Sequence, residues 1–256
     1  MAMRTPVSIA AFVASAAMAA SLSACAYNED LGRSQLLLVD DAALGQAAAQ
    51  AWQETLSTQR ISRDPQANAR VRSVGSRIVL AAGLGNRNWE YVVFDNDSAN
   101  AFVLPGGRMG VNVGLLRIVE NDDQLAAVIG HEVAHTVAQH AAERYSQTAA
   151  AQLGLSVAQG VAGQSRAGQA ISAFGGAGAQ LGFLLPFSRK HELEADRLGV
   201  DLMAAAGYNP RQAVVLWRRM AAQGGRPGTP SFASTHPSDA ARIDQLEQYL
   251  RARGWG

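Results

Sequence analysis

Apolar positions recur along much of the chain at the spacing of an α-helix. In residues 67–80, Val71, Val74 and Ile78 fall on one face, which predicts an amphipathic helix that ends at the glycines after it. Comparable Ala-rich or amphipathic patterns predict further helices over residues 42–56, 124–150, 189–206, 210–223 and 238–251. The chain is therefore expected to be mostly helical.

A different pattern lies between the second and third of these helices. Residues 89–94 are Trp-Glu-Tyr-Val-Val-Phe, a run rich in residues that favour strands. Two short apolar segments follow within residues 100–113, on either side of Pro105 and Gly106, which suit a turn. The pattern predicts a strand and then a hairpin. The expected fold class is α+β, mostly helical, with a small sheet beside the next helix, which the run Asn121-Asp122-Asp123 caps.

Composition narrows the class of protein. The 256 residues carry a formal net charge of +1, and hydrophobic residues make up 48% of them. That length and that apolar fraction suit one packed domain plus a targeting segment. A near-neutral chain without a Lys/Arg-rich run is not typical of nucleic-acid-binding proteins, so no nucleic-acid partner is expected.

The N-terminus has the pattern of a secretory signal. A basic start at Arg4 precedes an apolar stretch from Val7 to Leu22, and the segment ends in Leu-Ser-Ala-Cys25. That ending resembles the bacterial lipobox, which implies cleavage before Cys25 and acyl chains that anchor it to a membrane. Because Ala26 rather than Asp follows, we expect a lipid-anchored protein at the periplasmic face of the outer membrane in a bacterial envelope. The alternative is a cleaved, soluble export signal with an incidental cysteine.

The strongest chemical signal lies in the helix predicted over residues 124–150. It reads His131-Glu132-Val-Ala-His135, and residues four apart lie on one helix face, so both imidazoles can bind one zinc ion. Glu132 lies about 100° around the helix, where its carboxylate reaches a water on the metal without being a ligand. His140 lies about 140° from His135 and should miss the metal. The alternative is a helix with ordinary surface histidines.

A catalytic zinc needs a third protein ligand, and the chain has no cysteine after Cys25. In the helix over residues 189–206, Glu192 and Asp196 share a face, whereas Glu194 points away from it. We therefore predict Glu192 as the third ligand and Asp196 as the acceptor of the Nδ1–H of a zinc-bound histidine. The alternative is a solvated charged face shared with the neighbouring basic residues.

These motifs, in this order, resemble a known family. The segment from Asn100 to Gly107, Gly114-Leu-Leu, the His-Glu-x-x-His run and the Glu192 to Asp196 run resemble the gluzincin peptidases that include HtpX and the CAAX-prenyl proteases. Within that family the chain looks most similar to the soluble periplasmic branch of BepA and LoiP. The resemblance implies a zincin-like metallopeptidase domain.

The resemblance also implies the site and the activity. His131, His135 and Glu192 would hold one Zn²⁺ per chain, and Glu132 would be the general base. The expected function is a zinc-dependent endopeptidase that cuts peptide bonds of exported or envelope proteins in protein quality control. The expected division is a lipoprotein signal peptide (1–24), an N-terminal tether and helix (25–65) and the zinc metallopeptidase domain (66–256).

Further features extend this hypothesis. Asn100, Ala101 and Phe102 are candidates for an edge strand that pairs with an extended substrate, unless the hairpin is plain sheet structure. His236 lies in a Ser-Thr-His-Pro segment that resembles one near the metal in the BepA-like branch. It is a candidate fourth ligand or latch, unless it is an ordinary loop histidine. The Gly-rich residues 154–182 are a candidate gate over the cleft.

A second class of function is kept open. The chain would then be a periplasmic chaperone or an outer-membrane assembly factor with latent protease activity. The intact Glu132 favours the enzyme over this alternative. The expected partners are a protein or peptide substrate and, through Cys25, a membrane. The oligomeric state is not predicted.

Overall fold

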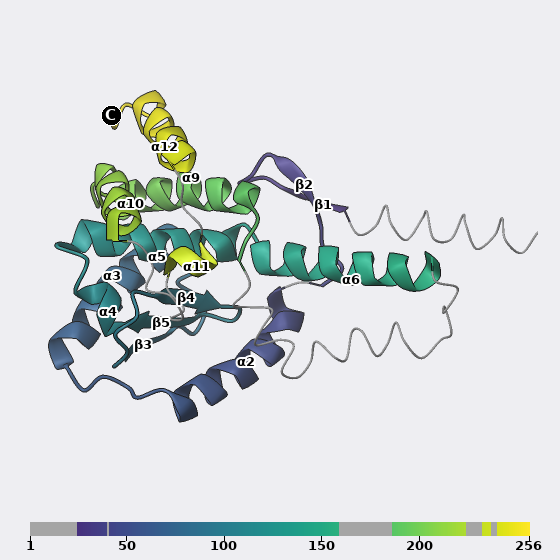
Figure 1. Cartoon of the computed structure of the whole chain (residues 1–256), viewed down its shortest axis with the longest axis horizontal. Coiled ribbons are helices and arrows are strands. Elements are labelled where there is room, and N and C mark those ends of the chain that lie inside the picture. Colours follow the sequence, from purple (N-terminus) through teal and green to yellow (C-terminus); the bar gives the residue numbers. More distant parts are fainter. Residues whose placement is uncertain (1–24, 40, 159–185, 224–231, 237–239) are drawn as a thin grey trace, which may run out of the picture.

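Helices make up most of the structure (Figure 1). The computed structural model describes residues 25–39, 41–158, 186–223, 232–236 and 240–256. The helices are α2 (Asp41–Thr58), α3 (Pro65–Ala81), α4 (Val113–Leu116), α5 (Asp122–Val137), α6 (His140–Ala158), α9 (Arg189–Ala205), α10 (Arg211–Gln223), α11 (Phe232–Thr235) and α12 (Ala240–Ala252). The strands are β1 (Cys25–Asn28), β2 (Arg33–Leu36), β3 (Glu90–Phe94), β4 (Ala101–Leu104) and β5 (Arg108–Asn112).

The predicted strand and hairpin form one three-stranded sheet in the order β3-β5-β4. β5 is the central strand, parallel to β3 and antiparallel to β4, and Ala101 pairs with Val111 in the second of these ladders. β4 is therefore an edge strand of the sheet. The predicted α+β fold, mostly helical with a small sheet, is confirmed.

α5 is the central element of the core. It lies between the sheet on one side and α9 on the other; α10 also packs against α5, and α12 packs against α9 and α10 (Figure 1). Every residue of α5 from Gln124 to His135 is buried. A helix enclosed on all sides suits a run rich in Ala, Val and Ile, because these side chains fill space without polar atoms that would need partners.

Two glycines allow α5 and α9 to approach closely. A Cβ atom added at Gly130 would lie 2.9 Å from the carbonyl oxygen of Gly199, and one added at Gly199 would lie 3.0 Å from the backbone nitrogen of His131. The two backbones are thus in contact where the helices cross. This contact brings the first turns of α9, which contain Glu192 and Asp196, beside His131.

The long helix predicted over residues 124–150 is interrupted. α5 ends at Val137 and α6 begins at His140, because Gln139 adopts a φ of 53°. This left-handed conformation is uncommon for a residue with a side chain. The sequence contains no Gly or Pro at this point, so the break could not be read from it. The turn places His140 beside the end of α5.

The N-terminal part contains a hairpin that the sequence pattern did not predict. Residues 25–65 were expected to be a tether and a helix, but β1 pairs with β2 in an antiparallel hairpin before α2 begins. The turn-forming residues Asn28, Asp30 and Gly32 between two short segments were the signal that could have revealed it. The hairpin lies against α6, near the end of α9 where that helix begins (Figure 1).

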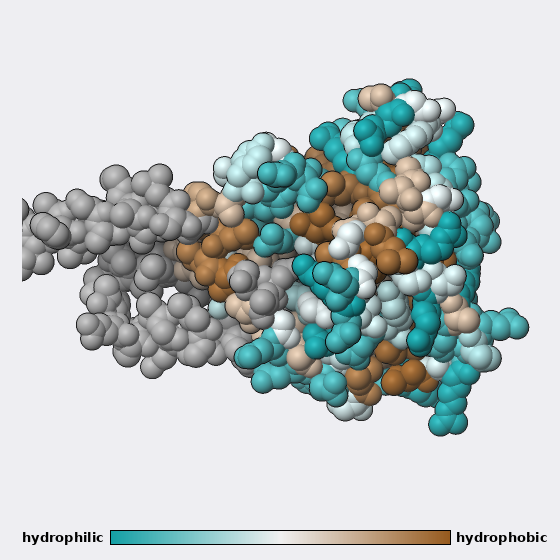
Figure 2. Space-filling view, turned by 180° about the vertical axis from the view of Figure 1, so that it is seen from behind, coloured by the Kyte–Doolittle hydropathy of each residue, from teal (hydrophilic) through white to brown (hydrophobic). Residues whose placement is uncertain are grey.

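Among the described residues, no helix is both long and apolar enough to cross a bilayer. Seen from behind, hydrophilic residues separate several apolar areas from one another (Figure 2). The predicted signal peptide (1–24) and most of the predicted gate (154–182) lie outside the described residues.

Candidate metal centre

α5 presents the two histidines of the His-Glu-x-x-His motif to one point. The helix begins after Asn121, whose side-chain oxygen accepts a hydrogen bond from the backbone of Gln124. One turn separates His131 from His135, and their Nε2 atoms lie 3.1 Å apart. The helical spacing therefore places them as the sequence predicts, and burial removes both from bulk water.

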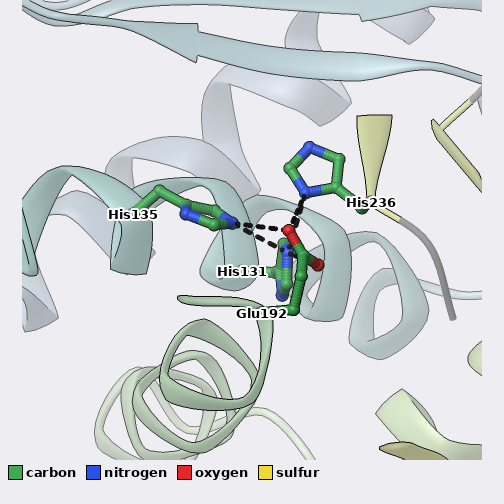
Figure 3. Close-up of side chains that lie close together, drawn as sticks. All are labelled: His131, His135, Glu192 and His236. Carbon is green, nitrogen blue, oxygen red and sulfur yellow. Dashed lines mark hydrogen bonds and ion pairs between the residues drawn. The ribbon is translucent and has the colours of Figure 1, made fainter. Parts of the chain in front are cut away.

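Two further side chains reach the same point from other parts of the chain (Figure 3). Ser188 caps α9 by accepting a hydrogen bond from the backbone of His191, which sets Glu192 in the first turn of the helix. Glu192 Oε2 lies 3.3 Å from His131 Nε2. His236, just after α11, places its Nδ1 3.0 Å from Glu192 Oε1 and 3.2 Å from His131 Nε2.

The spacing of these four side chains fits a tetrahedral metal. Ligand atoms that bind zinc at 2.0–2.1 Å lie about 3.4 Å from one another. Here the candidate atoms of His131, His135, Glu192 and His236 are 3.0–3.6 Å apart in the pairs that are in contact. Three imidazole nitrogens and one carboxylate oxygen are a ligand set that zinc accepts. The donor chemistry and the spacing therefore fit zinc.

The electrostatics of the cluster also favour a cation. Burial lowers the pKa of His131, but hydrogen bonds to Asp196 and Glu192 outweigh it and raise that pKa to about 9. Burial likewise opposes ionisation of Glu192, yet hydrogen bonds with His131 and His236 hold its pKa below the usual value. The buried carboxylates thus attract positive charge to the point where the four side chains meet. A divalent cation there satisfies the same demand.

Asp196 orients the first histidine. Its Oδ1 lies 3.0 Å from His131 Nδ1, so His131 donates there and keeps Nε2 directed at the cluster. Arg242 on α12 holds Asp196 in turn, with Nη2 donating to Oδ1 at 2.7 Å. No sequence motif pointed to Arg242. The available signal was its place on the buried stripe of α12, in line with Leu246 and Leu250.

His135 has a different neighbour. Burial, with help from nearby cationic groups, lowers the pKa of His135 well below its usual value, so the ring is neutral, as a metal ligand requires. Its Nδ1 lies 2.9 Å from Nδ1 of His140. As expected from the helix geometry, neither His140 nor Glu194 lies among the four converging side chains.

Glu132 lies next to the cluster and not within it. Its Oε1 is 3.1 Å from Nε2 of His236, and burial raises the pKa of its carboxyl group. The nearby backbone of Val103 in β4 acts in the opposite direction and lowers that pKa. A carboxylate with a raised pKa, closer to neutral pH, accepts a proton more readily, which suits a general base.

A cleft opens over this site. Its lining includes the edge strand β4, Glu132, His135, Phe187 and His236. Of the three residues predicted for a substrate edge strand, Ala101 and Phe102 begin β4 and Asn100 directly precedes it; all three line the cleft. The sheet edge, the candidate base Glu132 and two of the converging side chains, His135 and His236, thus face one space.

Comparison with known proteins identifies the family. Residues 65–250 match the model of peptidase family M48. The chain belongs to this family. It is also 42% identical over 181 residues to the mitochondrial metalloendopeptidase OMA1 of Schizosaccharomyces pombe, covering 70% of this chain and 52% of the relative. The human OMA1 is 30% identical over 233 residues, covering 86% of this chain and 44% of the relative.

The beta-barrel assembly-enhancing protease of Escherichia coli is also similar, with 29% identity over 188 residues, covering 70% of this chain and 38% of that protein. The chain thus spans about half the length, or less, of these curated relatives. The match to family M48 confirms three predictions: the gluzincin family, the enzyme class of metalloendopeptidase and zinc as the cofactor. The BepA-like branch is not singled out, since OMA1 proteins match as well.

The predicted location at the outer membrane of a bacterial envelope is wrong. Six relatives are OMA1 proteins named as mitochondrial, from two yeasts, a plant, two mammals and a fish. The short lipobox-like ending at Cys25 misled the sequence analysis. Cys25 itself is exposed at the start of β1, and its acylation stays a prediction.

Proposed function

We propose that this M48 chain is a zinc-dependent endopeptidase in which His131, His135 and Glu192 hold the metal. One observation supports this most: three side chains from two helices direct ligand atoms at one buried point, with spacings that suit zinc. Helical spacing in the sequence favours the same three residues, so the sequence pattern and the geometry of the fold support the choice independently.

Glu132 is the proposed general base. A bound zinc ion supplies Lewis acidity, which acidifies water and polarises a peptide carbonyl. The Glu132 carboxylate takes the proton of the attacking water and delivers it to the leaving nitrogen. Its place on the cleft wall, beside the candidate ligands and the edge strand, supports this role.

The direct test is digestion of casein by the purified protein. We expect cleavage that a chelator stops and that added zinc restores, because the proposed reaction depends on the metal. A pre-incubated sample without chelator is the control. Absence of cleavage with zinc bound would favour the alternative, a chaperone or assembly factor with latent protease activity, which the comparisons do not favour.

His236 is the proposed fourth ligand in a resting state. Its Nδ1 lies within contact of His131 and Glu192, and its Nε2 lies beside Glu132. In that place it would occupy the position that water needs, so it acts as a latch that must leave before catalysis. An anomalous-scattering map of zinc-loaded crystals with His236 turned away from the metal would contradict this role.

β4 is the proposed docking strand for an extended substrate. The backbone carbonyl of Asn100 accepts a hydrogen bond from the backbone N–H of Asn112. Because backbone groups alternate along an antiparallel ladder, those of Phe102 also point toward β5, and those of Ala101 and Val103 point toward the free edge. The shared cleft supports this, because Val103 of β4 and the proposed base Glu132 both line it. A substrate paired to this edge would pass Glu132.

A series of N-methylated peptides tests this docking. We expect each methyl group on an N–H that faces β4 to lower kcat/KM about two- to tenfold, because one hydrogen bond is lost. Methyl groups on the intervening residues should be tolerated, since their N–H groups point away. The unmethylated peptide is the reference. Equal losses at every position away from the cleaved bond would speak against strand addition.

The proposed domain division follows the same reasoning. We keep residues 66–256 as the peptidase domain and 25–65 as a separate N-terminal segment, with its hairpin and helix. The contacts of that hairpin with α5, α6 and α9 give it a more specific role.

A further inference from the structure

Hydrogen bonds fix the N-terminal hairpin beside the C-terminal end of α5. Gln35 donates from Nε2 to the carbonyl oxygen of Ala138 at 2.8 Å and to Glu143 Oε2 at 2.7 Å. Asn28 in the facing strand holds Gln35 by donating to its Oε1. The backbone of Leu38 donates to Oγ of Ser146 in α6 at 2.8 Å. The hairpin thus binds Ala138, which directly follows α5 and lies three residues after His135, although the hairpin lies outside the segment that matches the M48 family.

Arg33 extends from this hairpin between two carboxylates. Its Nε and Nη2 donate to Oε1 and Oε2 of Glu194 at 2.6 and 2.7 Å. Its Nη1 and Nη2 donate to the two oxygens of Glu143 at 2.8 Å each. The side chain is only 14% exposed, so these are not loosely solvated surface pairs. A guanidinium that makes two paired contacts of this kind fixes the orientation of both carboxylates.

Glu194 connects Arg33 to a zinc ligand through His140. Oε2 of Glu194 lies 3.1 Å from Nε2 of His140, and Nδ1 of His140 lies 2.9 Å from Nδ1 of His135. A zinc-binding His135 has no proton on Nε2, so its proton is on Nδ1 and is donated to His140. His140 must then accept at Nδ1 and donate from Nε2, and the Glu194 carboxylate accepts. We call this chain of contacts, from His135 through His140 and Glu194 to Arg33, the relay. Metal binding by His135 allows its hydrogen bonds to run only in the direction from His135 to Glu194.

We propose that Arg33 is a positioning residue that prepares His135 for zinc through Glu194 and His140. This relay mirrors the support of the other ligand, where Arg242 holds Asp196 and Asp196 accepts from His131. Each zinc-binding histidine is thus oriented by a carboxylate that an arginine fixes. The break at Gln139 makes the second relay possible, because it turns His140 back toward His135. The inference rests on the proposed zinc site.

The first test is the zinc affinity of Arg33→Ala, measured on the full purified chain by competition with a chelator of known affinity. We expect the dissociation constant for zinc to rise about 10- to 100-fold, the usual cost of losing an outer partner of a ligand. Arg117→Ala is the matched control: Arg117 pairs with Asp97 on the surface, where both side chains are mostly exposed. Its zinc affinity should be unchanged.

A double-mutant cycle separates the relay from general destabilisation. His140→Asn keeps an amide oxygen that can accept from His135 but removes the nitrogen that reaches Glu194. In this background Arg33→Ala should raise the dissociation constant less than about twofold, because the relay is already cut. An equal fold-change in both backgrounds would overturn the relay.

Two further results complete the test. Glu194→Ala removes the carboxylate of the same relay and leaves every hairpin residue unchanged, and it should raise the dissociation constant as Arg33→Ala does; this variant decides the matter if Arg33→Ala does not fold. A lower unfolding midpoint of metal-free Arg33→Ala with unchanged zinc affinity would show a merely structural arginine and overturn the proposal. If the unaltered chain binds no zinc, the proposed function itself fails.

Discussion

Replacing Glu132 by Gln is expected to lower kcat for casein or peptide cleavage by about 10²- to 10⁴-fold, the range for a lost general base. The amide has nearly the shape of the carboxylate but cannot take a proton from water. Because Glu132 is not among the proposed ligands, zinc content should remain at one ion per chain. Cleavage rates and metal analysis on the same preparation measure both effects.

Glu120→Gln is the matched control for this change. Glu120 lies before α5, outside the ligand cluster, and its side chain is 60% exposed. It should retain full activity. Near-normal cleavage by Glu132→Gln would remove Glu132 from the role of base, and loss of zinc from it would place Glu132 among the ligands instead.

The second large effect is expected from Glu192→Gln. This change removes the only anionic ligand of the proposed set and leaves a neutral amide, a much poorer zinc ligand. We expect the dissociation constant for zinc to rise by more than about 100-fold, above the range for outer partners. Cleavage at limiting zinc should disappear with the metal. Chelator competition measures the affinity, and casein digestion measures the activity.

Glu247→Gln is the control for Glu192→Gln, because Glu247 on α12 pairs with the exposed Arg218 and Arg251, away from the cluster. Its zinc affinity should equal that of the unaltered chain. Unchanged zinc affinity in Glu192→Gln would assign the third ligand to another residue. His236 would be the first candidate, since it is the remaining member of the cluster.

The parts of the site that follow helix periodicity were predictable from the sequence. His131 and His135 share a face because they are one turn apart, and the structure brings their Nε2 atoms to within 3.1 Å. Glu192 and Asp196 share a face of α9 for the same reason, and each reaches His131. Local geometry decides which residues share a helix face, so one sequence is enough to see that, whereas the approach of Glu192 and Asp196 to His131 comes from the packing of α9 on α5.

The parts that depend on tertiary contacts were not predictable. Arg33 and Glu194 are 161 positions apart, and Arg33 lies in no motif, so their pairing appears only in the fold. No Gly or Pro marks the helix break at Gln139 in the sequence. The placement of His140 beside His135 depends on this break and could therefore not be predicted. The supporting partners of His131 and His135 therefore needed the structure, whereas the proposed ligands could be named from the sequence.

The most direct test of the zinc site is an anomalous-scattering map from crystals of the zinc-loaded protein, with data collected on both sides of the zinc absorption edge. The predicted result is one peak about 2.0–2.1 Å from Nε2 of His131, from Nε2 of His135 and from a carboxylate oxygen of Glu192. A peak elsewhere in the chain, or none with zinc in excess, would contradict it.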